Sequence, residues 1–206
     1  IKNNYCDLYI NYNYFISKIN NKFFKKKKCK KLIGPKFFLI NQKIYKKRKN
    51  PKKIFMFFGG HDNKMLSIKI IKLLKNIKDI RIKLVTNDAK IKDIIKKLNF
   101  KKIELINQKM KFYKLLNDCK FGIVSGGSII FDLIYNKVPF ICIPVAKNQI
   151  NNLVNLKKKN YINLYKKKIN NQFTKYFIRC NNKKCKKLKL IDGDGLARVV
   201  KEIKKV

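Results

Sequence analysis

Two glycine-rich turns carry the clearest chemical signal in this 206-residue chain. Ser125-Gly126-Gly127-Ser128 lies within the segment GIVSGGSIIFDLIYNKVPFICIPVAKNQ, residues 122–149, and Gly59-Gly60-His61-Asp62 follows an apolar run. Glycine lets the backbone bend tightly and lets a ligand approach the main-chain amides. A helix that begins at Ser128 would direct unpaired N–H groups and the positive end of its dipole at the first turn. The two turns together therefore predict a site that could hold one diphosphate.

Three polar side chains near the first turn are candidate ligand contacts. Asp132 lies one turn into the expected helix, in a chain with only 11 acidic residues, and could accept hydrogen bonds from a ribose diol. The alternative for Asp132 is a favourable interaction with the helix dipole or a surface ion pair. Asn148 and Gln149 follow the next apolar strand and would face phosphate or sugar, or else cap the helix that follows.

The elements that must position these residues alternate regularly from residue 53 onward. Short apolar strands are separated by helices of about ten residues, a rhythm that favours right-handed crossovers and a parallel sheet. The sequence therefore predicts an α/β fold with helices on the sheet and both glycine turns at the carboxyl edge, where ligands of open α/β sheets bind. Strands are expected at 54–58, 81–86, 103–106, 121–124, 139–144 and 161–164, and helices at 64–76, 89–98, 110–118 and 150–159, with two or three more near the C-terminus.

Three separated motifs resemble one family. The stretch SGGSIIFDLIYNKVPFICIPVAKNQ is similar to the nucleotide-sugar loop of the UDP-sugar hydrolases of pseudaminic acid biosynthesis, relatives of the transferases that add GlcNAc to lipid-linked peptidoglycan precursors. Upstream, LIGPKFFLINQKIYKKR and KKIFMFFGGHD resemble the entry into that family's C-terminal domain. Downstream, LIDGDGLARVVKEI is similar to its closing Asp-Gly-x-Gly-x-x-Arg helix. The resemblance implies a Rossmann-like sheet, the second domain of a GT-B-type enzyme.

The resemblance also implies roles for particular residues. The backbone near Ile106 and Met110 would hold the uracil base. Asp132 stands where the family has glutamate and would bind the ribose with a side chain about one methylene shorter. His61 stands where the family usually has serine, and its role is that of a polar loop residue near the phosphates or sugar, with action as a base as the alternative.

The family's first domain, which carries the histidine thought to activate water, has no counterpart in this sequence. The chain begins at Ile1, has no methionine before Met56, and opens on CDLYINYNYF, which resembles the end of that domain. Residues 1–50 are therefore expected to be the tail of a preceding domain and a linker, and residues 51–206 the nucleotide-sugar-binding domain. A separate N-terminal domain is a possible partner, and no catalytic residue is assigned.

The expected function is the UDP-sugar-binding half of a hydrolase that releases UDP from a diacetamido-trideoxy-sugar. One alternative is the donor-binding domain of a UDP-sugar glycosyltransferase that builds a cell-surface or spore-coat polysaccharide. A second alternative is a basic nucleic-acid-binding module, since the formal net charge is +42. The basic residues are almost all lysine, whereas a nucleic-acid surface more often concentrates arginine and aromatic side chains. The dense lysine runs at 25–31 and 183–189 are interpreted as solvated faces that still attract polyanions.

Cysteine usage and hydropathy set the remaining expectations. The six cysteines, at 6, 29, 119, 142, 180 and 185, show no repeated CxxC spacing, so neither a metal site nor a cofactor is expected. Reduced thiols would suit a cytoplasmic protein. No signal-peptide pattern and no apolar run of 18 residues or more is present, so no integral membrane segment is expected, and UDP or a UDP-sugar is the expected ligand.

Overall fold

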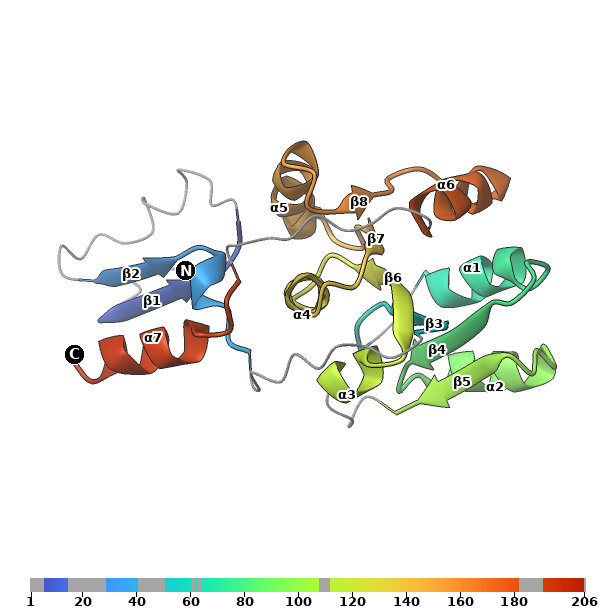
Figure 1. Ribbon diagram of the computed structural model, residues 1–206, viewed down its shortest axis with the longest axis horizontal. Helices are drawn as coiled ribbons and strands as arrows, with labels where there is room; N and C mark the ends of the chain where they lie inside the picture. The colour runs from blue at the N-terminus through green and yellow to red at the C-terminus, as the bar shows by residue number, and fades with distance from the viewer. Residues whose placement is uncertain are drawn as a thin grey trace.

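Short parallel strands and the helices between them account for most of the structure (Figure 1). The structure is a computed structural model that describes residues 6–14, 29–40, 51–60, 62, 64–107, 112–181 and 191–205. Its strands are β1 (Leu8–Asn11), β2 (Lys30–Ile33), β3 (Lys53–Phe57), β4 (Arg81–Val85), β5 (Ile103–Ile106), β6 (Cys119–Ser125), β7 (Phe140–Ile143) and β8 (Asn163–Leu164). Its helices are η2 (Pro35–Phe37, a 3-10 helix), α1 (Leu66–Leu74), α2 (Ala89–Lys97), α3 (Phe112–Leu116), α4 (Ile129–Tyr135), α5 (Lys147–Lys158), α6 (Asn171–Asn181) and α7 (Gly195–Ile203).

The main sheet has the strand order β5-β4-β3-β6-β7-β8, and every pair in it is parallel. The chain adds β4 and β5 on one side of β3, then crosses over and adds β6, β7 and β8 on the other. The order reverses between β3 and β6, where the connections leave the sheet toward opposite faces. In open α/β sheets the crevice outside such a reversal is where ligands bind.

Both faces of the sheet are buried, as a parallel sheet requires. Phe55 and Phe57 of β3 pack on one side with α3, α4 and α5, and Ile54 and Met56 pack on the other with α1, α2 and α6. Alternate residues of one strand thus contribute to two separate apolar cores. The predicted α/β sheet with helices on its faces is confirmed.

Several element boundaries differ from the sequence-based expectation for local reasons. The helix expected from residue 64 begins at Leu66, because Met65 adopts a left-handed backbone with φ of 49°. The helix expected from residue 150 begins at Lys147, so it includes Asn148 and Gln149 in its first turn. The expected helix 110–118 is described only over Phe112–Leu116.

A second, smaller unit combines segments from both ends of the chain. Strands β1 and β2 form a parallel pair that sequence periodicity did not reveal, and α7 lies beside them (Figure 1). Arg198 of α7 donates to the carbonyl of Lys36 at 2.9 Å and to both carboxylate oxygens of Asp192. Pairing with Arg198 lowers the pKa of Asp192 to about 2. These contacts give the closing Asp-Gly-x-Gly-x-x-Arg motif an architectural role.

The small unit is joined to the main sheet by aromatic packing. The rings of Tyr12 and Phe38 lie 5.6 Å and 5.0 Å from the ring of Phe131 on α4, and the amide of Tyr14 donates to the side-chain oxygen of Asn152 at 2.8 Å. Aromatic pairs at such separations stabilise a structure by more than the burial of their apolar area alone. Although α7 lies within the expected domain 51–206, its contacts are with the N-terminal segment, and the division at residue 50 stays a prediction.

Within the described ranges, no helix has both the length and the apolar character needed to cross a bilayer. The same part of the chain contains no cluster of three or more His, Cys, Asp or Glu side chains suited to a metal ion. The thiols of Cys6 and Cys29 lie 3.3 Å apart as free cysteines at the start of the β1–β2 pair.

The first prediction concerns the attachment of α7. A Cβ added at Gly195 would lie 2.1 Å from the carbonyl oxygen of Phe38, so Gly195→Ala must displace α7 from η2. We expect overpacking to cost about 1–3 kcal/mol and amide hydrogen exchange in α7 to accelerate, while α2 stays protected. Leu196→Ala, which truncates an exposed side chain on the same helix, is the matched control. Unchanged exchange in Gly195→Ala would contradict this packing.

Candidate nucleotide site

The two glycine-rich turns emerge side by side at the carboxyl edge of the sheet. Strand β3 pairs directly with β6, with Phe57 opposite Val124, so the segments that follow them start about 5 Å apart. The prediction that both turns open at one sheet edge is therefore confirmed. Their position is the point of strand-order reversal, between β3 and β6.

The glycines of these turns serve two different purposes. Gly59 has a φ of +93°, and no atom of the described residues lies within 4 Å of a Cβ added at Gly59, Gly60 or Gly127. A Cβ at Gly126, in contrast, would lie 2.6 Å from Leu153 Cδ1 and 2.9 Å from Gln149 Oε1. Gly126 is thus required by the packing of α5 on the turn, whereas Gly59, Gly60 and Gly127 border open space that a ligand could occupy.

The loop Gly59–Asp62 contains a carboxylate that binds the amides at the start of α1. The carboxylate of Asp62 accepts from the amides of Leu66 at 2.9 Å and Ser67 at 2.7 Å, and Asp62 is buried. Asp62 therefore caps α1 and occupies the amides that a phosphate would otherwise use. His61, predicted beside it, lies outside the described residues.

After the turn Ser125–Ser128, helix α4 begins without a side-chain cap. Ser125 is buried as the last residue of β6, and Ser128 is the N-cap of α4, as the sequence predicted. Ser128 has helical backbone angles and its hydroxyl makes no cap hydrogen bond, so this side chain does not occupy the first amides of α4. Because α4 has only seven residues, its dipole is small, and an anion here would depend mainly on the turn amides.

Asp132 occupies an apolar setting on α4. Its side chain is partly buried, and burial raises the pKa of its carboxyl group to about 7. A carboxylate that is costly to ionise in the free protein gains from ligand hydroxyls that donate to it. The surface ion pair considered as an alternative is absent from the described contacts of Asp132.

The remaining predicted contacts are spread along the same edge. Gln149 Oε1 accepts from the amide of Val145 at 2.9 Å, which matches the capping alternative, and Asn148 is exposed in the first turn of α5. Ile106 ends β5, two strands from the reversal, and its carbonyl accepts from the amide of Thr86 at 3.1 Å. Met110, the other predicted base contact, lies outside the described residues.

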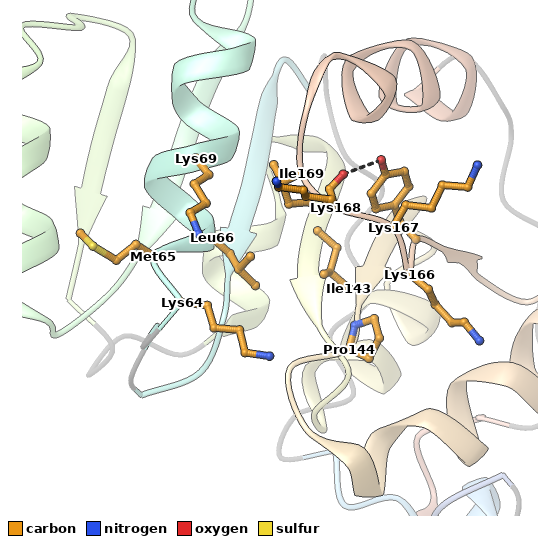
Figure 2. A pocket seen from close by; sticks show the side chains of 11 residues that line it. Lys64, Met65, Leu66, Lys69, Ile143, Pro144, Lys166, Lys167, Lys168 and Ile169 are labelled. Carbon is orange, nitrogen blue, oxygen red and sulfur yellow. Dashed lines mark hydrogen bonds between the residues drawn. The ribbon is translucent and has the colours of Figure 1, made fainter.

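A basic cleft beside the turns was missed by the sequence analysis. It has a volume of about 700 Å³ and lies between the start of α1, the end of β7 and the loop after β8 (Figure 2). Five of its eleven lining residues are lysine and none is acidic: Lys64, Met65, Leu66, Lys69, Ile143, Pro144, Tyr165, Lys166, Lys167, Lys168 and Ile169. Lysine is so frequent along the chain that no local pattern marked these positions.

The fold and the two turns define a class of protein. MurG of Acinetobacter baumannii superimposes with a TM-score of 0.62 at 12% identity, over 97% of this chain and 66% of that one. The UDP co-structure of S. aureus MnaA gives a TM-score of 0.54 at 16% identity, over 75% of this chain and 45% of that one. The chain has a Rossmann-like α/β fold of the GT-B type.

Sequence comparison is more specific than the fold. The chain is 30% identical over 172 residues to the UDP-2,4-diacetamido-2,4,6-trideoxy-beta-L-altropyranose hydrolase of Campylobacter jejuni, which covers 81% of this chain and 62% of that protein. The resemblance to this family of UDP-sugar hydrolases, first indicated by the three motifs, is confirmed. The chain spans less than two thirds of the relative's length. No protein-family model matches the chain.

The same substitution should destabilise the protein at Gly126 and have almost no effect at Gly127. Gly126→Ala places a methyl group against Leu153 and Gln149, and we expect it to lower the free energy of unfolding by about 1–3 kcal/mol. Gly127→Ala enters open space and should change it by less than about 0.5 kcal/mol. Urea denaturation of the two variants measures the difference. Equal losses would show that the turn does not pack on α5 as described.

Asp132 should make stability depend on pH. Its pKa is raised from 3.8 to about 7 in the folded protein, so between these values folding binds a proton and stability falls as pH rises. Asp132→Asn removes this penalty. We expect the difference in the free energy of unfolding between the variant and wild type to increase in the variant's favour by roughly 1–3 kcal/mol from pH 5 to pH 8. Urea denaturation at the two pH values measures it. A difference that does not grow with pH would show that Asp132 ionises freely.

Proposed function

We propose that this chain binds UDP or a UDP-sugar at the point of strand-order reversal between β3 and β6. The observation that carries the proposal is the direct pairing of these strands, so that the turns containing Gly59, Gly60 and Gly127 follow adjacent strand ends. No described atom lies within 4 Å of a Cβ added at any of the three glycines, which leaves room for a ligand. The similarity to a protein named as a UDP-sugar hydrolase supports the same ligand. A UDP co-structure among proteins of this fold is consistent with it.

The two turns would contribute unequally to binding the diphosphate. The amides at the start of α1 already bind the Asp62 carboxylate, so the first loop would offer mainly the backbone of Gly59 and Gly60. The Gly127-Ser128 turn has no internal carboxylate and would provide the main anion contact. Asp132 on α4 would then accept hydrogen bonds from the ribose, and the backbone after β5 would meet the base.

We propose further that the chain supplies the leaving-group half of a hydrolase that acts on a UDP-linked diacetamido-trideoxy-sugar in pseudaminic or related nonulosonic acid synthesis. Water would attack the anomeric carbon, the bond from that carbon to the diphosphate oxygen would break, and UDP would leave. Main-chain amides at the turns would stabilise the charge that develops on the diphosphate. The group that activates water is not assigned to any residue of this chain, so we expect binding without turnover from it alone.

The test is calorimetric titration with UDP. We expect weak, saturable binding that Gly127→Ala weakens about tenfold or more, because its methyl group occupies the approach to the turn amides while the fold is retained. Leu196→Ala, remote on α7, should bind as wild type does. Absence of saturable UDP binding would contradict the proposal. Tight binding of a short oligonucleotide that persists as salt rises would instead favour the nucleic-acid alternative.

Asp132 gives the same titration a second readout. If ribose hydroxyls donate to its carboxylate, UDP binding near pH 6.5 favours the ionised form and releases a fraction of a proton. Titrations in buffers of different ionisation enthalpy measure that proton. Asp132→Asn should reduce the release and weaken binding, whereas a release that is unchanged by the substitution would remove Asp132 from the ribose site.

A further inference from the structure

Cys6 and Cys29 form a close pair of thiols in the small unit, away from the glycine turns. Their Sγ atoms lie 3.3 Å apart, and both cysteines are free and partly exposed. They are 23 residues apart in the sequence, and each lies shortly before a strand, Cys6 before β1 and Cys29 before β2. These two strands lie side by side in Figure 1.

Strand pairing holds the backbones of the two cysteines close together. In the parallel pair Leu8 lies opposite Lys30, and the amide of Lys30 donates to the carbonyl of Asp7 at 2.8 Å. Asp7 and Lys30 are sequence neighbours of the two cysteines, so the thiols stay near each other while the strands are paired. A disulfide bond is about 2.0 Å long, so the Sγ atoms need to approach by only about 1.3 Å.

Among the cysteines that the structure describes, only this pair is open to a reagent in solution. Cys119, Cys142 and Cys180 are buried, and oxidation by a dissolved molecule requires access to the sulfur. Loss of hydration and a hydrogen bond with Cys6 raise the pKa of Cys29, which keeps the resting form a thiol.

A metal ion is a poorer partner for these thiols than a second sulfur. Structural zinc sites use four ligands. Across the described ranges, no three His, Cys, Asp or Glu side chains are grouped closely enough to hold a metal ion. Two thiols in contact are sufficient for a disulfide.

The β1–β2 pair is a part of the fold that a covalent bond would stabilise. A two-stranded sheet is marginally stable by itself, and of the eight residues in β1 and β2 only Leu32 is buried. An ion pair between Lys30 and Glu202 connects β2 to α7. A bond between Cys6 and Cys29 would close the chain into a loop and restrict the unfolded state.

We propose that Cys6 and Cys29 form a reversible disulfide that stabilises the β1–β2 pair, with a low-molecular-weight disulfide such as oxidised glutathione as the oxidant. One cysteine thiolate attacks a glutathione sulfur, forms a mixed disulfide and displaces one glutathione thiolate. The other cysteine thiolate attacks the cysteine sulfur of the mixed disulfide, forms the Cys6–Cys29 bond and displaces the second glutathione. The two thiols lose two electrons and two protons, which convert one oxidised glutathione into two reduced molecules.

The first experiment incubates the whole chain with oxidised glutathione, alkylates the remaining thiols and identifies linked peptides by mass spectrometry. We expect the Cys6–Cys29 disulfide to exceed mixed disulfides at these residues by about tenfold or more, because the second step is intramolecular. Excess reduced glutathione should restore both thiols.

Two variants test whether the pair acts as a unit. Cys29→Ser should leave Cys6 in the mixed disulfide, because the second attack is removed. Cys185→Ser, which removes a thiol outside the described residues, is the matched control and should form the bond as wild type does. Thiols that stay reduced, mixed disulfides that accumulate in wild type, or a bond from either residue to another cysteine would overturn the inference.

Amide hydrogen exchange tests the stabilising effect of the bond. Oxidation should slow exchange in β1 and β2 by about tenfold or more and leave α2 unchanged. Cys29→Ser treated in the same way should show no such slowing. Equal exchange in the oxidised and reduced protein would overturn the stabilising role. Neither result depends on UDP binding, so this inference and the proposed function are tested separately.

Discussion

The pairing of β3 with β6 is the constraint on which the rest of the site depends. These strands are separated by more than sixty residues in the sequence, and two complete strand–helix units intervene before the chain returns to pair with β3. Because the second half of the sheet is built outward from that contact, the turns after the two strands must share one edge. A change in strand order would leave each glycine turn intact and still separate them, so the candidate site is a property of the topology more than of either motif.

Local sequence predicted the elements well and their long-range partners poorly. The runs around Phe55, Leu84 and Ile123 are apolar and short, which marks buried strands, and the glycines after two of them mark sharp turns. The β1–β2 pair has no such signal, because it is held by α7 from the far end of the chain and by rings that pack on Phe131. A motif such as Asp-Gly-x-Gly-x-x-Arg cannot reveal from its spacing that Gly195 is needed for the approach of Phe38.

The candidate site shows the same division. Placing Gly127 and Asp132 near each other needed only helix geometry, and the sequence supported it. Deciding that Gly126 serves packing, that Asp62 caps α1 and that Gln149 binds the amide of Val145 required the positions of residues far along the chain or of backbone amides. Side chains that close the loops internally and side chains that await a ligand have the same chemistry in a sequence, and only their partners distinguish them.

The structure adds most to the sequence where the distribution of charge is concerned. A net charge of +42 spread over lysines predicts only a general attraction for anions, which salt weakens. The fold determines where this charge is neutralised. Lys53 pairs with Glu104, and Lys83 with Asp118, away from the carboxyl edge of the sheet. Asp62 lies at that edge, but its carboxylate accepts hydrogen bonds from helix amides. The lysines near the glycine turns are then left facing apolar walls and solvent. An anion that enters there meets exposed lysines, so the attraction weakens as salt rises. The electrostatic character of the carboxyl edge therefore depends on where the few acidic residues are used as well as on where the many lysines lie.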